Sequence, residues 1–389
     1  MLSTFGLNDE QLTMRDMASS FARQKLAPYA LAWDRDKYFP MNTLREAAAL
    51  GMAAMGAREQ FGGSGLSRFD AVLVFEALAT GCPSIAAYLS VHNMCAWMID
   101  AFGSTAQRRA WIPRLASMEV FSSYCLTEPC CGSDASALRT KAQRRGDQFV
   151  VSGEKQFISG ASAGGEDHLY LVMARTGGDG ASGISALIVQ GGTPGLTFGA
   201  LERKMGWNAQ PTRAVSFENC PVPAQNLLGE EGQGFKIAMA GLDGGRLNIG
   251  ACSLGGGQAA LDKTLRYVRE RKAFGRSLDE FQALQFRLAD MATGLEAARA
   301  LLWRAAHALD ARATGATTLC AMAKRVATDA GFAVANDALQ LHGGYGYLSD
   351  YGIEKIVRDL RVHQILEGAN EIMRVIVARD MLGGSRRHE

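Results

Sequence analysis

The pattern of apolar residues changes twice along the chain, and this change limits the possible folds more than any other feature of the sequence. Residues 122–229 contain short runs of β-branched and aromatic residues separated by Gly and Pro, at 149–151, 169–174, 184–189 and 214–217. Such runs predict a meander of short strands, and hence a small sheet or barrel. Before and after this region, apolar residues recur with helical spacing instead. The sequence therefore predicts a helical unit, a β unit and a second helical unit.

The helical segments carry recognisable caps and apolar seams. Asn8 or Asp9 is a candidate cap for a helix in which apolar residues recur three or four positions apart. Residues 69–102 are rich in Ala, Leu and Met, which predicts helices buried on several faces. A bundle helix is predicted around residues 295–309, and a second one over 318–341. At 389 residues the chain is long enough for two or three units, and we place their limits at 1–121, 122–229 and 230–389.

Charge and composition exclude several classes of partner. Lys and Arg total 41 against 39 Asp and Glu, so no excess charge favours nucleic acid or an anionic membrane. No apolar run approaches the roughly 18 residues of a membrane span, and residues 1–10 do not resemble a signal peptide. None of the eight cysteines forms a Cys-x-x-Cys pair, so we expect no metal site. We expect a bacterial cytoplasmic protein, or a mitochondrial matrix protein if the chain is a processed eukaryotic form.

One glycine pattern is misleading. Gly178, Gly180 and Gly183 fit the G-x-G-x-x-G fingerprint of dinucleotide-binding folds. That fingerprint requires a strand before it and a helix after it. Here a strand-like run, 184–189, follows the glycines, so we predict a hairpin loop and no Rossmann domain.

Two β runs end in residues that suit a flat, polar ring. Residues 124–134 begin as a strand and continue as a turn rich in hydroxyls and small side chains. A solvent loop that merely ends the strand is the alternative interpretation. Residues 157–160 close another β run and place Phe157 beside Ser159. This pair either flanks a ring system or fills the core of the β unit.

Three further segments have the chemistry of an anion site. Asp243-Gly244-Gly245-Arg246 lies in a helical stretch, where each Gly costs roughly 1 kcal/mol and so indicates close approach of a ligand or of another helix. Arg269, Arg271, Lys272 and Phe274 combine phosphate-binding cations with a ring that can stack on a base. Residues 340–347 place glycines after a long helix, where backbone donors can meet a pyrophosphate. The alternatives are a surface salt bridge, a solvated helix face and an ordinary helix terminator.

Glu367 is the candidate general base. It follows Ile365 and Leu366 and precedes Gly368. A carboxylate held among apolar neighbours has a raised pKa, which suits proton abstraction near neutral pH. The alternative is a surface Glu at the start of a helix.

Together these motifs resemble the acyl-CoA dehydrogenase family along the whole chain. The resemblance rests on Leu-Thr-Glu-Pro-x-x-Gly-Ser-Asp (126–134), Gln-x-His-Gly-Gly-x-Gly (340–346) and Glu-Gly-x-Asn-Glu (367–371). Residues 90–100, 206–214 and 363–368 are most similar to the isobutyryl-CoA subfamily. The resemblance implies an α+β multidomain fold: an N-terminal helical domain, a central β-barrel and a C-terminal four-helix bundle. It also implies a homotetramer with FAD bound between subunits.

The resemblance assigns site residues by motif position. Those that would contact FAD are Tyr124, Cys125, Leu126, Thr127, Ser133, Phe157, Ile158, Ser159, Arg271, Phe274, Phe281, Gln282, Gln340, Leu341, His342, Gly343, Gly344, Ala369, Asn370 and Glu371. Those that would meet the acyl-CoA are Ser133, Asp243, Gly244, Gly245, Arg246, Glu367, Gly368 and Arg379. Some relatives carry their catalytic Glu at the position of Gly245, and because Gly has no side chain, Glu367 is left as the only candidate base.

The implied reaction is the α,β-dehydrogenation of a short branched acyl-CoA, isobutyryl-CoA to methacrylyl-CoA, with electrons passed to electron-transfer flavoprotein. Because one methylene is worth only about 1–3 kcal/mol of discrimination, 2-methylbutyryl-CoA and butyryl-CoA are alternative substrates. An oxidase or monooxygenase on the same fold, and a catalytically silent flavoprotein that acts as a binding partner, are alternative functions. Cys130-Cys131 stands where small residues are usual, and we hypothesise that this pair makes the enzyme sensitive to oxidation.

Overall fold

A computed structural model describes residues 6–383. The N-terminal region is helical and comprises α1 (Asp9–Phe21), a π-helical turn (Ala22–Leu26), α2 (Ala30–Asp36), α3 (Met41–Ala49), α4 (Arg68–Ala79), α5 (Pro83–Phe102) and α6 (Thr105–Ala116). Asn8 caps α1, and its side chain accepts a hydrogen bond from the N–H of Gln11 at 2.8 Å. The predicted start of the first helix is therefore confirmed.

The central region forms one eight-stranded sheet. Its strands are β1 (Phe121–Cys125), β2 (Lys141–Arg145), β3 (Gln148–Ser159), β4 (His168–Arg175), β5 (Ile184–Gln190), β6 (Leu196–Phe198), β7 (Thr212–Pro223) and β8 (Leu227–Leu228). They are ordered β6-β7-β3-β2-β4-β5-β8, and β1 pairs in parallel with β4. All four predicted β runs lie inside strands. The glycines at 178, 180 and 183 fall between the antiparallel strands β4 and β5, so the predicted hairpin loop is confirmed.

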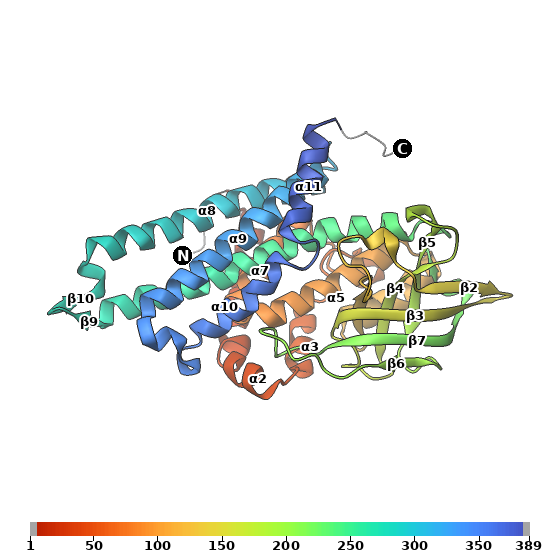
Figure 1. The fold of residues 1–389 in the computed structure, drawn as a ribbon, viewed down its shortest axis with the longest axis horizontal. Coiled ribbons are helices and arrows are strands. Elements are labelled where there is room, and N and C mark those ends of the chain that lie inside the picture. The colour runs from red at the N-terminus through yellow and green to blue at the C-terminus, as the bar shows by residue number, and fades with distance from the viewer. Residues whose placement is uncertain (1–5, 384–389) are drawn as a thin grey trace.

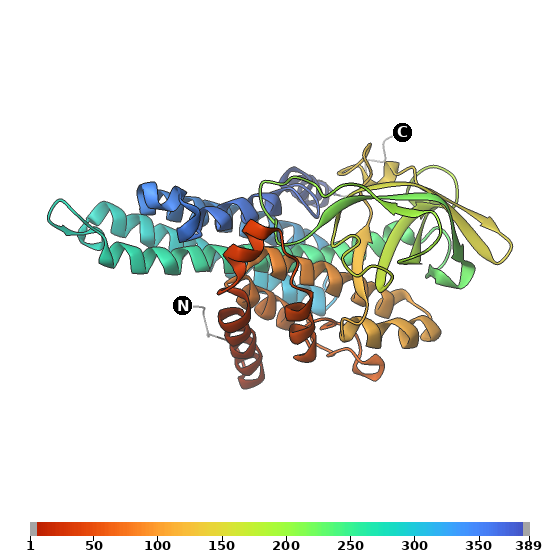
Figure 2. The same cartoon turned by 90° about the horizontal axis from the view of Figure 1, so that it is seen from below.

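Helices return after the sheet. The long helix α7 (Gly234–Glu270) leads through the small hairpin of β9 (Lys272–Ala273) and β10 (Arg276–Ser277) into α8 (Gln282–Asp310), α9 (Ala316–His342), α10 (Ile353–Arg361) and α11 (Asn370–Met381). Figures 1 and 2 show the β9–β10 hairpin at one end of the molecule and the sheet at the other. The helical–β–helical order predicted from the sequence is thus confirmed. The residue limits of the three domains stay a prediction, and their outer ends, 1 and 389, lie outside the described residues.

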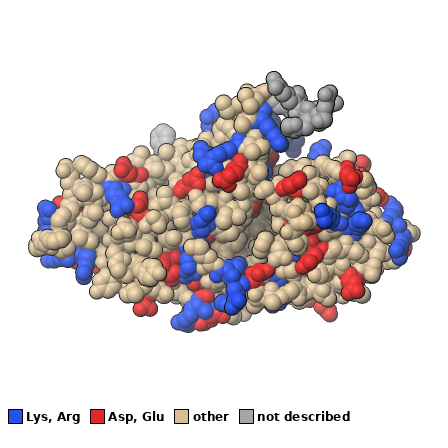
Figure 3. All heavy atoms as spheres, viewed as in Figure 1, with Lys and Arg blue, Asp and Glu red and all other residues tan. Residues whose placement is uncertain are grey.

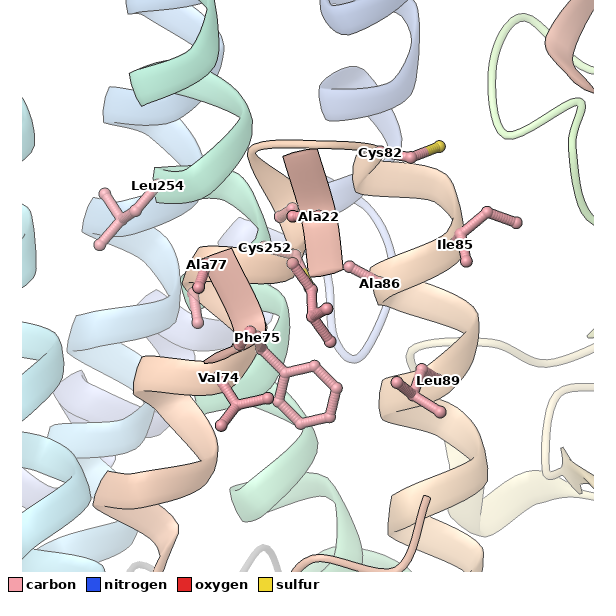
Figure 4. Packing of buried hydrophobic residues seen from close by; sticks show 14 of the residues in the cluster. Ala22, Val74, Phe75, Ala77, Cys82, Ile85, Ala86, Leu89, Cys252 and Leu254 are labelled. Atoms are coloured by element: carbon pink, nitrogen blue, oxygen red, sulfur yellow. The ribbon is translucent and has the colours of Figure 1, made fainter. Parts of the chain in front are cut away.

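Helix α7 packs at the centre of the largest apolar core, between α4, α5, α8 and α9. Figure 4 shows Phe75 of α4 and Ala86 of α5 lying beside Cys252 of α7. A Cβ at Gly331 of α9 would lie 2.3 Å from the carbonyl oxygen of Ser253 on α7. A larger residue there would separate the two helices, so this glycine allows the bundle to close.

The surface and the thiols are unexceptional. The face in Figure 3 carries Lys and Arg interspersed with Asp and Glu. Within residues 6–383, no helix is both long enough and apolar enough to cross a membrane. All eight cysteines are free, and only Cys130 is exposed.

Candidate active site

A cavity of about 740 Å³ lies where the sheet meets α5, α7, α11 and the turn before α11. Its size falls in the usual range for small-molecule sites. Eleven residues that the sequence nominated for FAD or substrate line it: Tyr124, Leu126, Thr127, Ser133, Phe157, Ile158, Ser159, Arg246, Glu367, Gly368 and Arg379. They come from segments more than 250 positions apart, and the fold brings them together.

The candidate base lies on a strained turn between α10 and α11. The φ angle of Glu367 is +53°, a left-handed conformation that is uncommon for a residue with a side chain. Gly368 follows with φ +92°, which its missing side chain permits. Strain of this kind costs on the order of 1–3 kcal/mol and is concentrated at functional sites. The turn holds the Glu367 carboxyl at the cavity wall.

Glu367 keeps one oxygen of its carboxyl group away from water and without a partner among the described residues. Its Oε2 atom is inaccessible to solvent and has no hydrogen-bond partner within the described part of the chain. A Cβ on Gly245 of α7 would lie 2.4 Å from that atom, so the carboxyl group occupies space that only glycine leaves open. Burial raises the pKa of Glu367 to about 7, and Lys324 and Arg246 oppose this rise. A carboxyl group with this pKa can exchange a proton near neutral pH.

The turn after β1 is fixed by a buried ion pair. Lys155 is fully buried, and its Nζ donates to the Leu126 carbonyl at 3.1 Å and to the Glu128 carboxylate at 2.7 Å. Glu128 also accepts from the backbone N–H groups of Arg139 and Thr140. These bonds hold the loop that places Thr127 and Ser133 at the cavity.

Strand alternation divides the first motif between two faces of β1. Tyr124 and Leu126 line the cavity, and the hydroxyl of Tyr124 is buried without a partner among the described residues. Cys125 lies between them in sequence but packs into the core of the sheet. Successive side chains of a strand point to opposite faces, which accounts for the difference.

Phe157 offers an aromatic face at the cavity. Its φ angle is +60° and it is 65% exposed, so its ring is presented outward instead of filling the sheet core. Ser159 lies beside it at the end of β3 and also lines the cavity. An exposed aromatic ring next to hydroxyl groups suits a flat heterocycle with polar edges.

Helix α7 contributes Arg246. It is 4% exposed, its guanidinium contacts Asp243 at 2.7 Å, and its Nε donates to the Glu367 carbonyl at 3.4 Å. The second oxygen of Asp243 accepts from Thr317 at 2.6 Å. Asp243 and Gly244 are not among the residues lining the cavity. Asp243 instead holds Arg246 in place, and Gly244 approaches Arg68 closely.

A second cavity, of about 500 Å³, lies at the opposite end of α7 and α9. Gln340, Leu341, His342, Gly343, Gly344 and Arg271 line it, together with Arg287 and the rings of Tyr267 and Tyr345. A Cβ at Gly343 or at Gly344 would meet nothing within 4 Å, so the backbone there is open to a ligand. Cations, accessible backbone and aromatic rings form a donor set that fits a pyrophosphate joined to a nucleoside.

Ten nominated residues line neither cavity. Besides Cys125, Asp243, Gly244 and Gly245, they are Phe274, Phe281, Gln282, Ala369, Asn370 and Glu371. Phe274 is 95% exposed on the β9–β10 hairpin and contacts Phe281 edge to face. Gln282 begins α8 on the surface. At the start of α11, the side chain of Asn370 is buried and bonded to α9, while Ala369 and Glu371 flank it.

Sequence reasoning did not nominate Trp207, which lines the first cavity. Its backbone N–H donates to the Asp359 carboxylate at 2.6 Å, and its indole Nε1 donates to His363 Nε2 at 3.2 Å. His363 in turn contacts Ser253 at 2.6 Å, so the indole is held firmly against the cavity. Trp207 and His363 lie in two of the segments with the closer subfamily resemblance. Their place in these segments was the feature of the sequence that could have identified Trp207 as a cavity residue.

Comparison with known proteins agrees with this geometry. Models of the N-terminal, middle and C-terminal domains of acyl-CoA dehydrogenase match residues 8–119, 123–220 and 232–382. The chain therefore belongs to the acyl-CoA dehydrogenase family, whose members are FAD-dependent oxidoreductases acting on a CH–CH group.

Particular relatives are similar over nearly the whole chain. The mitochondrial isobutyryl-CoA dehydrogenase of Bos taurus is 52% identical, over 97% of this chain and 90% of that protein. The butyryl-CoA dehydrogenase structure from Megasphaera elsdenii is 37% identical with a TM-score of 0.93, covering 98% of this chain and 100% of that one. A chain from a study of the electron transferring flavoprotein of Acidaminococcus fermentans is 38% identical with a TM-score of 0.94, at the same coverage.

Proposed function

We propose that this enzyme catalyses the α,β-dehydrogenation of isobutyryl-CoA to methacrylyl-CoA, with Glu367 as the base. The observation that carries the proposal is the Glu367 carboxyl group, which faces a cavity with no competing hydrogen-bond partner on Oε2. A general base works best when its pKa lies near the working pH, and the pKa of Glu367, about 7, meets that condition.

The chain's own groups account for the proton transfer. Glu367 removes the proton from the carbon next to the thioester carbonyl, and the electron pair of that C–H bond forms the new double bond. The β-hydrogen leaves with its own electron pair as hydride. FAD, when bound, supplies the acceptor for that hydride. The backbone N–H of Glu367 donates to none of the described residues, so it is available to the thioester carbonyl as negative charge develops there.

The residues around the first cavity fit the isoalloxazine of FAD. Thr127 and Ser159 offer hydroxyl groups, and Phe157 offers an exposed ring. The second cavity fits the pyrophosphate and adenosine end, through Arg271 and the open backbone at Gly343 and Gly344. We infer that these residues hold the two ends of the cofactor.

The two cavities of one chain are too far apart to share one FAD. Arg246 lies in the first half of α7 and Arg271 directly follows its last residue, and a rise of 1.5 Å per residue separates them by roughly 37 Å. That gap exceeds the reach from the isoalloxazine to the pyrophosphate of one molecule. We therefore propose that a second copy of the chain completes each FAD site, in a homo-oligomer that we expect to be a tetramer.

The choice of a short branched acyl chain rests on one wall of the first cavity and on similarity. Trp207 is 5% exposed and is fixed by two hydrogen bonds, so it forms a rigid apolar boundary near Leu366. A fixed wall favours a short chain. The 52% identity to bovine isobutyryl-CoA dehydrogenase supports this choice. 2-Methylbutyryl-CoA differs from isobutyryl-CoA by one carbon, and butyryl-CoA differs from it by branching. These two thioesters are the alternative substrates.

We also propose electron-transfer flavoprotein as the electron acceptor. The similarity to the chain studied with the flavoprotein of Acidaminococcus fermentans supports this partner. A peroxide assay separates this acceptor from oxygen: the proposal predicts little hydrogen peroxide during turnover in air and rapid turnover with the flavoprotein. Stoichiometric peroxide would assign an oxidase instead.

Anaerobic titration tests the proposed substrate. Isobutyryl-CoA, 2-methylbutyryl-CoA, butyryl-CoA and isovaleryl-CoA are each added to the purified protein while the visible flavin band is followed. The proposal predicts rapid bleaching by isobutyryl-CoA and slower or partial bleaching by the others. Faster bleaching by another thioester would move the substrate and keep the reaction. With FAD bound, no bleaching by any of the four would refute the proposed function.

A further inference from the structure

Lys324 is a buried cation behind the turn that carries the candidate base. It lies on α9 and is 0% exposed. Its Nζ donates to the carbonyl of Gly368 and to the side-chain oxygen of Asn370, both at 2.9 Å. Both acceptors are neutral. Lys324 is therefore hydrogen-bonded to residues 368 and 370, which follow Glu367 in the turn.

Lys324 has no ion-pair partner within 4 Å in residues 6–383, although buried lysines are usually paired. The two other buried lysines, Lys155 and Lys355, contact Glu128 and Asp359 at 2.7 and 2.6 Å. An unpaired ammonium in this position carries a desolvation penalty that a neutral donor such as Gln would avoid. Holding the turn therefore does not by itself account for a lysine.

Two cations lie near Glu367, and of these only Lys324 lacks an ion-pair partner among residues 6–383. Arg246 of α7 also faces Glu367, but its charge is matched by Asp243 at 2.7 Å. Tyr124 of β1 and Cys252 of α7 lie near Glu367 as well, and burial raises the pKa of both so that they are neutral at physiological pH. The positive field at Glu367 thus comes chiefly from Lys324.

Two acidic groups face Lys324 besides Glu367, and they are Asp329 and Glu371. Asp329 accepts hydrogen bonds from Asn370 at 2.8 Å and from Gln364 at 2.7 Å, and Glu371 contacts Arg374 at 3.5 Å. Asn370 also donates to Thr328 at 3.0 Å, which fixes its amide with the oxygen toward Lys324. The ammonium is therefore held in one position relative to the base.

We propose that Lys324 is a positioning residue whose charge keeps Glu367 ionised when substrate closes the cavity. This inference rests on the proposed role of Glu367 as the base. An acyl chain that displaces water disfavours the carboxylate and drives it toward the inactive, protonated form. A fixed cation bonded to the same turn opposes that change. Burial lowers the pKa of Lys324 to about 8, and Glu367 opposes this fall, so the ammonium persists at neutral pH.

The sign of the expected effect follows from the charge. Lys324 lowers the pKa of Glu367, so removing its charge raises that pKa. The rate of flavin bleaching needs ionised Glu367 and falls on the acid side of that pKa. In a neutral variant, the acid limb of the pH profile therefore moves to higher pH. A role confined to holding the turn would lower the rate without moving the limb.

The test compares Lys324→Met and Lys324→Gln, which remove the charge, with Lys324→Arg, which keeps it. Arg304→Gln, which removes an exposed cation from α8, is the matched control. Bleaching by saturating isobutyryl-CoA is followed anaerobically between about pH 5 and pH 9. The proposal predicts that the limb moves up by about one pH unit or more in Met and Gln, and stays in place in Arg and in the control. Unmoved limbs in both neutral variants would overturn it.

A second measurement does not depend on turnover. The infrared band of the protonated Glu367 carboxyl group, identified by its loss in Glu367→Gln, is titrated in the wild-type holoenzyme and in Lys324→Gln. Its midpoint rises in the variant if the proposal holds, and an equal midpoint contradicts it. Failure of the proposed function looks different, because the wild-type protein itself would then not bleach with any thioester.

Discussion

Glu367 and Gly245 form a contact that determines where the base can lie. The carboxyl group of Glu367 occupies the space directly beside the Cα of Gly245, with Oε2 only 2.4 Å from the position of a Cβ. The resemblance to the family used Gly245 to exclude a second base and placed it among the residues that meet the acyl-CoA. The structure gives this glycine a further role, because it makes room for the base that is present.

Gly245→Ala therefore tests the position of the base without removing it. A methyl group there displaces the carboxyl group from the cavity wall, and misplacement of about 1 Å costs on the order of 10²-fold in rate. We expect flavin bleaching by isobutyryl-CoA to fall to that extent while FAD stays bound. Gly294→Ala on α8, where a Cβ meets nothing within 4 Å, is the control and should bleach at the wild-type rate. Wild-type bleaching by Gly245→Ala would show that the carboxyl group works from elsewhere.

The sequence predicts the identity of the base better than its environment. Its two preceding residues suggested an apolar setting, yet Ile365 is 55% exposed, and the space beside the carboxyl group is defined by α7 instead. Cys125 shows the same limit, since its motif is contiguous in sequence but divided by strand alternation in space. Trp207 was missed because its position depends on hydrogen bonds that it donates to Asp359 and His363, more than 150 residues away.

At the scale of elements, a buried ion pair joins three helices of the core. Arg299 of α8 is 1% exposed and donates to Glu76 of α4 at 2.8 Å. It also contacts Gln258 of α7 at 3.3 Å, and Glu296 on its own helix. The apolar seam of this helix was predicted, and Leu295, Ala298 and Leu302 are buried as expected. A burial pattern alone would have placed Arg299 on the solvent face, because the partner that allows its burial lies 223 residues earlier.

Arg299→Met removes the cation that is hydrogen-bonded to the buried Glu76 carboxylate. We expect it to lower the free energy of unfolding by about 3–5 kcal/mol, measured as shifts in the urea and thermal midpoints. Arg287→Met removes a part-exposed ion pair with Asp337, which joins α8 and α9 at 2.9 Å. This substitution should change the free energy of unfolding by no more than about 1 kcal/mol. Equal effects of the two substitutions would contradict the role assigned to the buried pair.

At the scale of the whole molecule, the order of the three regions was predictable because strands and helices differ in apolar period. The separation of the two cavities was not, since it depends on the lengths of α7 and α9 and on how they pack. That separation is the basis for placing each FAD between two copies of the chain. A single chain supplies Glu367 at one end and Arg271 at the other.

Mixed oligomers test this arrangement. Glu367→Gln and Arg271→Gln are each expected to bleach poorly, the first for lack of a base and the second for weak FAD binding. In a mixed oligomer, some sites combine Glu367 from one chain with Arg271 from the other, so co-expression should restore part of the bleaching amplitude. Activity of the co-expressed protein no greater than that of the separate variants would show that each FAD site lies within one chain.

The role of Glu367 as the base is tested by the rate of flavin bleaching in Glu367→Gln, measured by anaerobic rapid mixing with isobutyryl-CoA. Glutamine has nearly the same size but cannot accept the proton. We expect the variant to fold, keep its FAD, bind the thioester and bleach at least about 10²–10⁴-fold more slowly than the wild-type protein. Bleaching at the wild-type rate would contradict the assignment of Glu367 as the base.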